Sequence, residues 1–304
     1  MRGIRSGPRR SERRPRCRSG YNFSRLHALP PNLVILNHFL FFGSCVGIGA
    51  VSGFLGGLLG IGGGVVIVPT LIVLFDLAGL FDTHAATAVA VATSLACIVF
   101  TSLSAAITQI RAAMVDWSVV RRWAAFLILG SFLSGSFAAL LPTLLFRGFI
   151  GAFLLFVAFV MLTSWKPSAH RHQPGPALSA LLGTGGGLVS GIAGIGGGNV
   201  IVPTLVYFNT PVHRATATSS TLGVPIALAG ALGYIVSGFG SEPGSWMLGW
   251  VYLPAFVAIM SASILFAPVG VKVAHRVAPL PLRRTFGVLL VVVSARMLYS
   301  AVSA

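Results

Sequence analysis

The chain has 304 residues, of which 55% are hydrophobic and only 9% are charged, and its mean hydropathy is strongly positive. This composition excludes a soluble enzyme and predicts an all-α polytopic membrane protein, which we expect in a bacterial inner membrane. The formal net charge of +16 does not indicate a nucleic-acid partner, because nine of the 21 basic residues lie within the first 25 positions.

Residues 1–37 form this basic tail, which we expect to be disordered. Three explanations fit its composition: a cytosolic arm that lies on anionic lipid, an Arg- and Ser-rich targeting peptide, or an over-extended reading frame that is absent from the mature protein. The third requires a start at a non-Met codon such as Val34, because the next methionine after Met1 is Met114.

Apolar runs follow the tail along the whole chain. About 20 helical residues, at about 1.5 Å each, cross a hydrocarbon core of about 30 Å. Eight runs are long, and the two short ones are 65–75 and 199–208. The long runs are 39–59, 88–110, 123–141, 148–165, 177–194, 215–237, 247–269 and 285–302.

An internal repeat divides the chain. The segment GLLGIGGGVVIVPTL, residues 57–71, returns as GIAGIGGGNVIVPTL at 191–205, with twelve of fifteen positions identical. The exceptions are Leu58/Ile192, Leu59/Ala193 and Val65/Asn199. A second shared element, AVATSL at 90–95 and ATATSS at 215–220, follows each copy. The sequence therefore predicts two homologous membrane repeats, 38–165 and 177–304, joined by a polar linker at 166–176.

The repeated glycines, 60–64 and 194–198, predict a break in each half. Irregular backbone at membrane depth is tolerated only where it is buried in protein or lines a cavity. A short helix follows each break, and its free N–H groups and positive dipole end suit an anion. The alternative is that the glycines serve only tight helix packing. A dinucleotide fingerprint is discarded, because no strand precedes it.

The predicted substrate site uses uncharged donors, because no Asp or Glu falls within a long run. Each hydroxyl has the alternative of bonding a carbonyl of its own helix, and the asparagine has the alternative of packing. The predicted substrate-binding residues are Gly62, Gly63, Gly64, Gly196, Gly197 and Gly198 through their backbone amides, Thr93, Ser94, Thr218 and Ser219 through their hydroxyls, and the Asn199 amide.

Few other residues carry chemistry. His84 and His213 each precede an Ala-Thr-Ala run and form either a proton-coupling pair or two interfacial histidines. Arg296 lies in the last run, where we expect it to snorkel to the surface. We expect no metal site, cofactor or disulfide framework, because the three cysteines are scattered and lack CxxC spacing: Cys17, Cys45 and Cys97.

The doubled motif, together with the Val-Asp-Trp loop at 115–117 and HRATATSSTL at 213–222, resembles the sulfite exporter TauE/SafE family of membrane permeases. The resemblance extends from about residue 39 to residue 300. It implies a two-half permease that moves sulfite, sulfonates and other small organosulfur or carboxylate anions. The sequence departs from the pattern in its Arg-rich tail and in Ser220, which stands where the first half has Leu95.

The distribution of basic residues among the loops distinguishes between the possible membrane topologies. If each half has five membrane segments, the halves are inverted and ten basic residues share one side, opposite Arg147 with Asp76, Asp82 and Glu242. If each half nets four crossings, the halves are parallel and the basic residues divide five against six. Loop charge favours inverted repeats, whereas the nine basic residues of the tail oppose them. The ten are Arg111, Arg121, Arg122, Lys166, Arg171, Arg214, Lys272, Arg276, Arg283 and Arg284.

The function predicted from these features is secondary transport, as an exporter, of a small anion through the bilayer. A passive anion channel is the first alternative. A membrane-embedded enzyme or redox carrier is a weaker one, because no cluster of His, Cys, Asp or Glu lies at membrane depth.

Overall fold

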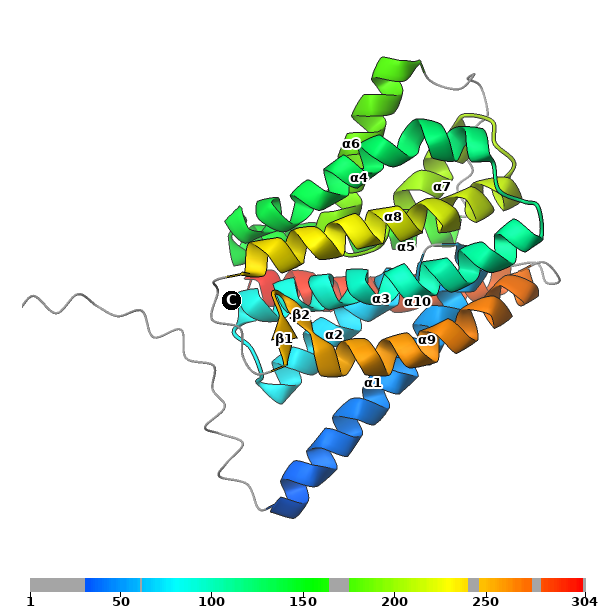
Figure 1. The fold of residues 1–304 in the computed structure, drawn as a ribbon. Helices are drawn as coiled ribbons and strands as arrows, with labels where there is room; N and C mark the ends of the chain where they lie inside the picture. Colours follow the sequence, from blue (N-terminus) through cyan, green and yellow to red (C-terminus); the bar gives the residue numbers. More distant parts are fainter. Residues whose placement is uncertain (1–30, 61, 164–174, 240–245, 275–279, 303–304) are drawn as a thin grey trace, which may run out of the picture.

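The computed structural model describes residues 31–60, 62–163, 175–239, 246–274 and 280–302, which form ten helices and one short hairpin (Figure 1). The first half holds α1 (Pro31–Leu59), α2 (Gly64–Ala78), α3 (Thr83–Arg111), α4 (Trp117–Leu140) and α5 (Thr143–Thr163). The second holds α6 (Pro176–Ala193), α7 (Gly198–Tyr207), α8 (Val212–Gly238), β1 (Met247–Leu248), β2 (Val251–Tyr252), α9 (Leu253–Ala274) and α10 (Leu280–Val302). Residues 1–30 of the predicted tail and 166–174 of the predicted linker lie outside the described residues.

Each helix covers one of the ten predicted apolar runs, which confirms the all-α polytopic fold class. Six helices in the described part of the chain are long and apolar enough to cross a membrane: α3, α4, α5, α8, α9 and the 39–59 part of α1. The prediction of a helix over 247–269 was only partly correct, because this segment begins with the β1–β2 hairpin. Gly249 turns this hairpin with a φ of +55°, and α9 begins only at Leu253.

The first two helices of each half run antiparallel. In the first half the start of α2 lies against α1, since a Cβ on Gly63 would be 2.5 Å from the Ser52 carbonyl oxygen. Near the other end of the pair, the rings of Phe41 and Phe75 stack at 6.3 Å. In the second half Tyr207, at the end of α7, shares a hollow with Leu178, near the start of α6. The chain therefore reverses at each glycine break.

The ends of the helices gather at two poles of the molecule. At the pole that we call the acidic end, Asp76 near the end of α2 pairs with Arg147 near the start of α5. At the pole that we call the basic end, the backbone N–H of Asp116, just before α4, donates to Thr218 Oγ1 in α8 at 3.0 Å. Helix α3 thus runs from the acidic to the basic end and α8 runs the opposite way (Figure 1).

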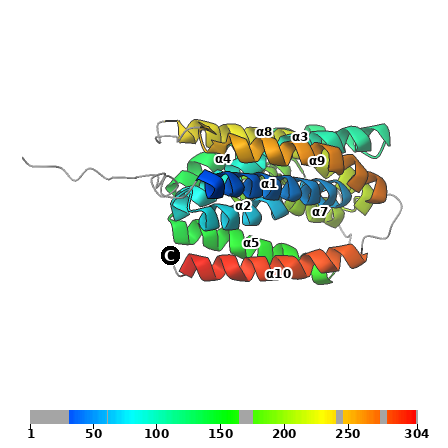
Figure 2. The same ribbon diagram turned by 90° about the horizontal axis from the view of Figure 1, so that it is seen from below.

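Helices of one half pack mainly on helices of the other. Helix α1 lies on α9, α4 on α6, α3 on α8, and α5 on α10, and Figure 2 shows the last pair along one side of the molecule. Small residues permit the first two contacts. Glycines spaced four apart on α1 and on α6 face backbone or β-carbon atoms of the partner helix: Gly49, Gly53 and Gly57, and Gly183, Gly187 and Gly191.

Candidate functional site

The two glycine breaks have the same backbone geometry. Gly63 and Gly197 are the residues before α2 and α7, with φ of +82° and +86°, a region that only glycine enters without strain. The carbonyl of each glycine accepts the N–H of the residue three positions later, Val66 or Val200, at 3.0 Å in both cases. The sequence repeat therefore corresponds to a repeat in local structure.

The two glycine breaks also contact each other between α3 and α8. A Cβ added to Gly64 would meet the Gly194 carbonyl oxygen, and one added to Gly62 would lie 3.1 Å from Ser102 Oγ. Ser94 Oγ of α3 donates to the same Gly194 carbonyl at 2.9 Å. Residues from both halves of the sequence thus meet at one place in the centre of the molecule.

Two more of the predicted binding hydroxyls, in addition to Ser94, bond to the backbone of the opposite half. Thr93 Oγ1 accepts the N–H of Tyr252, just before α9, at 3.0 Å. Thr218 Oγ1 accepts the N–H of Asp116, just before α4, at 3.0 Å. Neither hydroxyl shows the bond to its own helix carbonyl that we considered as the alternative. Ser219 Oγ is buried and has no hydrogen-bond partner among the described residues.

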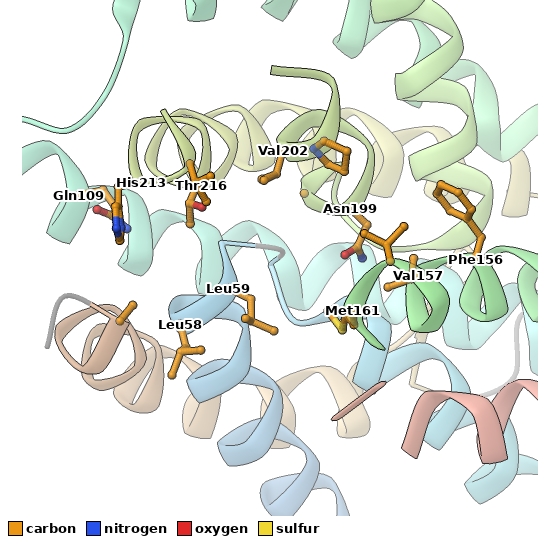
Figure 3. A pocket seen from close by; sticks show the side chains of 15 residues that line it. Leu58, Leu59, Gln109, Phe156, Val157, Met161, Asn199, Val202, His213 and Thr216 are labelled. Atoms are coloured by element: carbon orange, nitrogen blue, oxygen red, sulfur yellow. The ribbon is translucent and has the colours of Figure 1, made fainter. Parts of the chain in front are cut away.

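A cavity of about 100 Å³ lies beside this centre, between the ends of α1, α3 and α9, the last two turns of α5 and the starts of α7 and α8. Figure 3 shows Gln109, His213 and Thr216 at one side of it and Asn199 at the other. Leu58 and Leu59 supply apolar wall between them. Of the eleven predicted binding residues, Gly198 and Asn199 line this cavity.

Asn199 and Gln109 are buried polar side chains with unused hydrogen-bonding atoms. Asn199 is 8% exposed and its Nδ2 has no partner among the described residues; the same holds for Oε1 of Gln109, which is 3% exposed. Leaving such atoms unpaired costs about 1–3 kcal/mol each, so buried polar atoms normally have a partner, which a water molecule or a bound ligand in this cavity would supply. At the matching position of the first break, Val65 is fully buried.

Three features around Asn199 favour a negatively charged ligand. Gly198 and Asn199 are the first residues of α7, where N–H groups lack partners within the helix and the helix dipole is positive. The cavity reaches the surface at the exposed residues Val212 and His213, at the basic end. Exposed cations surround that end and attract anions: Arg111, Arg121, Arg122, Arg214 and Lys272.

The two histidines lie at opposite ends of the molecule. His213 lines the cavity, whereas His84 lies at the acidic end, where its Nε2 is 3.1 Å from the Leu141 carbonyl oxygen. Arg296 is exposed on α10, away from the cavity lining. No group of three or more His, Cys, Asp or Glu that could hold a metal occurs among the residues that the structure describes.

Gln109 and Thr216 line the cavity but were not predicted from the sequence as site residues. Gln109 is the one Asn or Gln in the apolar run 88–110, and a lone amide in such a run could have marked it as a candidate site residue. Thr216 follows His213 by three positions on one face of α8, and only the contact between the halves brings it to the cavity.

Comparison with known proteins agrees with this architecture. The family model described as sulfite exporter TauE/SafE matches residues 45–297. A probable membrane transporter protein of Haemophilus influenzae is 32% identical over 263 residues, which cover 85% of this chain and 98% of that protein. One of Methanocaldococcus jannaschii is 28% identical over 240 residues, 78% of this chain and 87% of that protein.

The probable membrane transporter protein YunE of Bacillus subtilis is 28% identical over 236 residues, which cover 66% of this chain and 84% of that protein. No solved structure matches the chain significantly. The family match covers most of the chain and agrees with the six apolar helices. The chain therefore belongs to the sulfite exporter TauE/SafE family and is a multi-pass membrane transporter, not an enzyme.

Proposed function

We propose that the protein is a secondary transporter that exports a small anion, such as sulfite, a sulfonate or a related organosulfur compound. The observation that carries the proposal is the Asn199 side chain, which lines the cavity from the first turn of α7 and whose buried Nδ2 has no hydrogen-bond partner among the described residues. A side-chain donor at a helix N-terminus is an arrangement that binds an anion without a buried cation.

The proposed binding set is centred on the second glycine break. Gly196, Gly197 and Gly198 would direct backbone N–H groups toward the anion, and Asn199 would add its amide. Gly62 and Gly64 support the same centre from the first break, because they lie against Ile195 and Gly194, whereas Gly63 lies against Ser52 of α1. Thr93, Ser94 and Thr218 already bond to protein atoms, so we assign them to holding the two halves together.

We also infer that the halves are inverted repeats, with the glycine breaks as re-entrant turns. The opposed directions of α3 and α8 support this inference, as does the reversal of the chain between α1 and α2. The excess of cations at the basic end supports a cytoplasmic location for that end. A cavity that reaches the surface there receives a cytoplasmic anion, which agrees with export.

Uptake into proteoliposomes tests the proposal. The purified protein is reconstituted and screened with sulfite, methanesulfonate, taurine and small carboxylates, with and without a pH gradient. Saturation and counter-flow of a labelled anion are expected of a transporter, whereas a passive channel shows neither. Absence of flux for every anion in the panel would contradict the proposal.

Substitution of Asn199 tests its role. Asn199→Val places there the residue that the first break has at Val65. Loss of a hydrogen bond to a charged ligand is expected to lower kcat/KM by about tenfold or more, and Asn199→Gln is the matched variant that keeps an amide donor. Unchanged kinetics in Asn199→Val would remove Asn199 from the site.

Substitution of the break glycines tests the loop geometry. Gly63→Val and Gly197→Val force a β-branched residue into a positive φ, so transport should be abolished while membrane insertion persists. Gly185→Val is the control, because a Cβ at Gly185 in α6 would meet no atom within 4 Å. Normal flux in both break variants would refute the site.

A further inference from the structure

A larger hollow joins the cavity at Asn199. It has a volume of about 610 Å³ and lies between α5, α6 and α7. Asn199, Phe156 and Pro203 line both spaces, so the two adjoin each other. Apart from Asn199 and Thr204, its walls are hydrophobic or aromatic and include Phe153, Leu182 and Val189. We call this space the α5–α6–α7 groove.

The groove is specific to the second half. Both α2 and α7 carry the sequence Val-Ile-Val-Pro-Thr-Leu, at 66–71 and 200–205. On α2, Val66 and Pro69 are buried in the core, whereas the matching Val200 and Pro203 on α7 are only half-buried and line the groove. The same local sequence is therefore packed in one half and left as the wall of a hollow in the other.

The two adjoining spaces differ in the chemistry that they accept. The small cavity offers the Asn199 amide and the positive end of α7, which suit a charged head. The groove offers apolar surface and has a volume within the range of pockets that hold organic ligands of moderate size. A molecule that fills both has a charged head and a hydrocarbon tail.

We propose that the α5–α6–α7 groove binds the hydrocarbon tail of an amphiphilic organic anion whose charged head lies at Asn199. This rests on the proposed function, because it assigns the head to the same site. The substrate class is then alkyl sulfonates, or carboxylates of similar shape, in preference to an inorganic anion. Burial of each added methylene favours binding, until the groove is filled.

The test is inhibition of transport by a homologous series. Full-length protein in proteoliposomes transports labelled methanesulfonate or sulfite, and straight-chain alkanesulfonates from ethanesulfonate to octanesulfonate are added as competitors. The concentration for half-inhibition should fall by roughly threefold to fourfold per methylene over several steps. Inhibition that does not depend on chain length would overturn the groove proposal.

A pair of neighbouring variants separates the groove from simple partition into lipid. Leu182 lines the groove, whereas Leu181 beside it is 71% exposed and does not line it. Leu182→Trp should abolish the dependence on chain length, whereas Leu181→Trp should retain it. Equal dependence on chain length in the two variants would overturn the proposal.

The remaining outcomes are also decisive. A phospholipid that co-purifies with the wild-type protein at one molecule per chain and is lost in Leu182→Trp would identify a lipid as the occupant, and would overturn the proposal. If methanesulfonate or sulfite is transported but inhibition does not depend on chain length, the groove proposal is wrong and the proposed function is not affected. Failure to transport any anion contradicts the proposed function itself.

Discussion

Arg147 and Asp76 form a two-point ion pair between α5 and α2 at the acidic end. Their contacts are Nη2–Oδ1 at 2.9 Å and Nη1–Oδ2 at 3.1 Å. Arg147 is 1% exposed, and its guanidinium also donates to Thr87 Oγ1 at 2.8 Å and to the Thr83 carbonyl at 3.0 Å. We expected Arg147 in a loop, and the structure instead buries it in α5. Its charge is neutralised by Asp76, which explains how one cation is accommodated at the acidic end.

Loss of the carboxylate should destabilise the protein. Asp76→Asn leaves the Arg147 guanidinium buried without its counter-charge, and we expect a loss of about 2 kcal/mol, less than for a fully buried pair because the Asp76 side chain is 35% exposed. The measurement is the thermal unfolding midpoint in detergent. Asp82→Asn is the control, because Asp82 caps α3 without a side-chain hydrogen bond. Equal midpoints for the two variants would contradict the assigned role.

The equivalent positions of Thr93 and Thr218 lead to a second prediction. Thr93→Val and Thr218→Val each leave a backbone N–H of the other half without its acceptor, at a cost of about 1–3 kcal/mol. Unfolding midpoints should fall by similar amounts while KM stays unchanged, and Thr→Ser at either position should restore stability. A raised KM with an unchanged midpoint would instead show that the hydroxyl binds substrate.

The hydrogen bonds of the Asp116 carboxylate lead us to expect that the stability of the protein depends on pH. Its Oδ1 accepts the Ser118 hydroxyl at 2.6 Å and the N–H groups of Ser118 and Val119 at 3.0 and 3.4 Å. The hydroxyl bond contributes most to lowering the pKa of Asp116, and the Arg214 charge adds to it, although partial burial opposes them. A lowered pKa in the folded state means that this stabilisation is present above the unfolded pKa and is lost as pH falls through the folded one.

Removal of this cap should therefore matter at neutral pH and not in acid. Asp116→Ala is expected to cost about 1 kcal/mol at pH 7. The difference in unfolding midpoint between wild type and variant should shrink below about pH 4, where the carboxylate of the unfolded chain takes up a proton, and should vanish once the pH is below the lowered pKa of the folded state. Midpoints measured from pH 7 to pH 3 check this, and a difference that stays constant over the range would contradict it.

Cysteine labelling tests the inverted arrangement. In a variant without native cysteines, Ala112→Cys and Pro211→Cys should react with an impermeant maleimide from one side of the membrane and Asp82→Cys from the other. The contact between Asp116 and Thr218 motivates the pairing of the first two. Labelling of Pro211→Cys from the same side as Asp82→Cys would establish parallel halves.

The positions of the helices could be predicted from the sequence because they depend on local properties. An apolar run long enough to cross a bilayer has no stable alternative to a helix in lipid, and a glycine cluster with positive φ interrupts that helix wherever it occurs. All ten helices and both breaks were found in this way. The β1–β2 hairpin was missed, because Met247, Leu248, Val251 and Tyr252 are as apolar as the helix that follows them.

The partners of individual side chains depended on the tertiary structure. Thr93 bonds a backbone group 159 residues away and Thr218 one 102 residues away, and no local pattern encodes such a pairing. Val65 and Asn199 hold equivalent places in nearly identical segments, yet one is enclosed in the core and the other faces a cavity. The sequence by itself determined the membrane fold, the repeat and the glycine breaks, because these follow from hydrophobicity and backbone freedom along the chain. Only the packing of one half against the other decided which polar groups remain unpaired beside an open space.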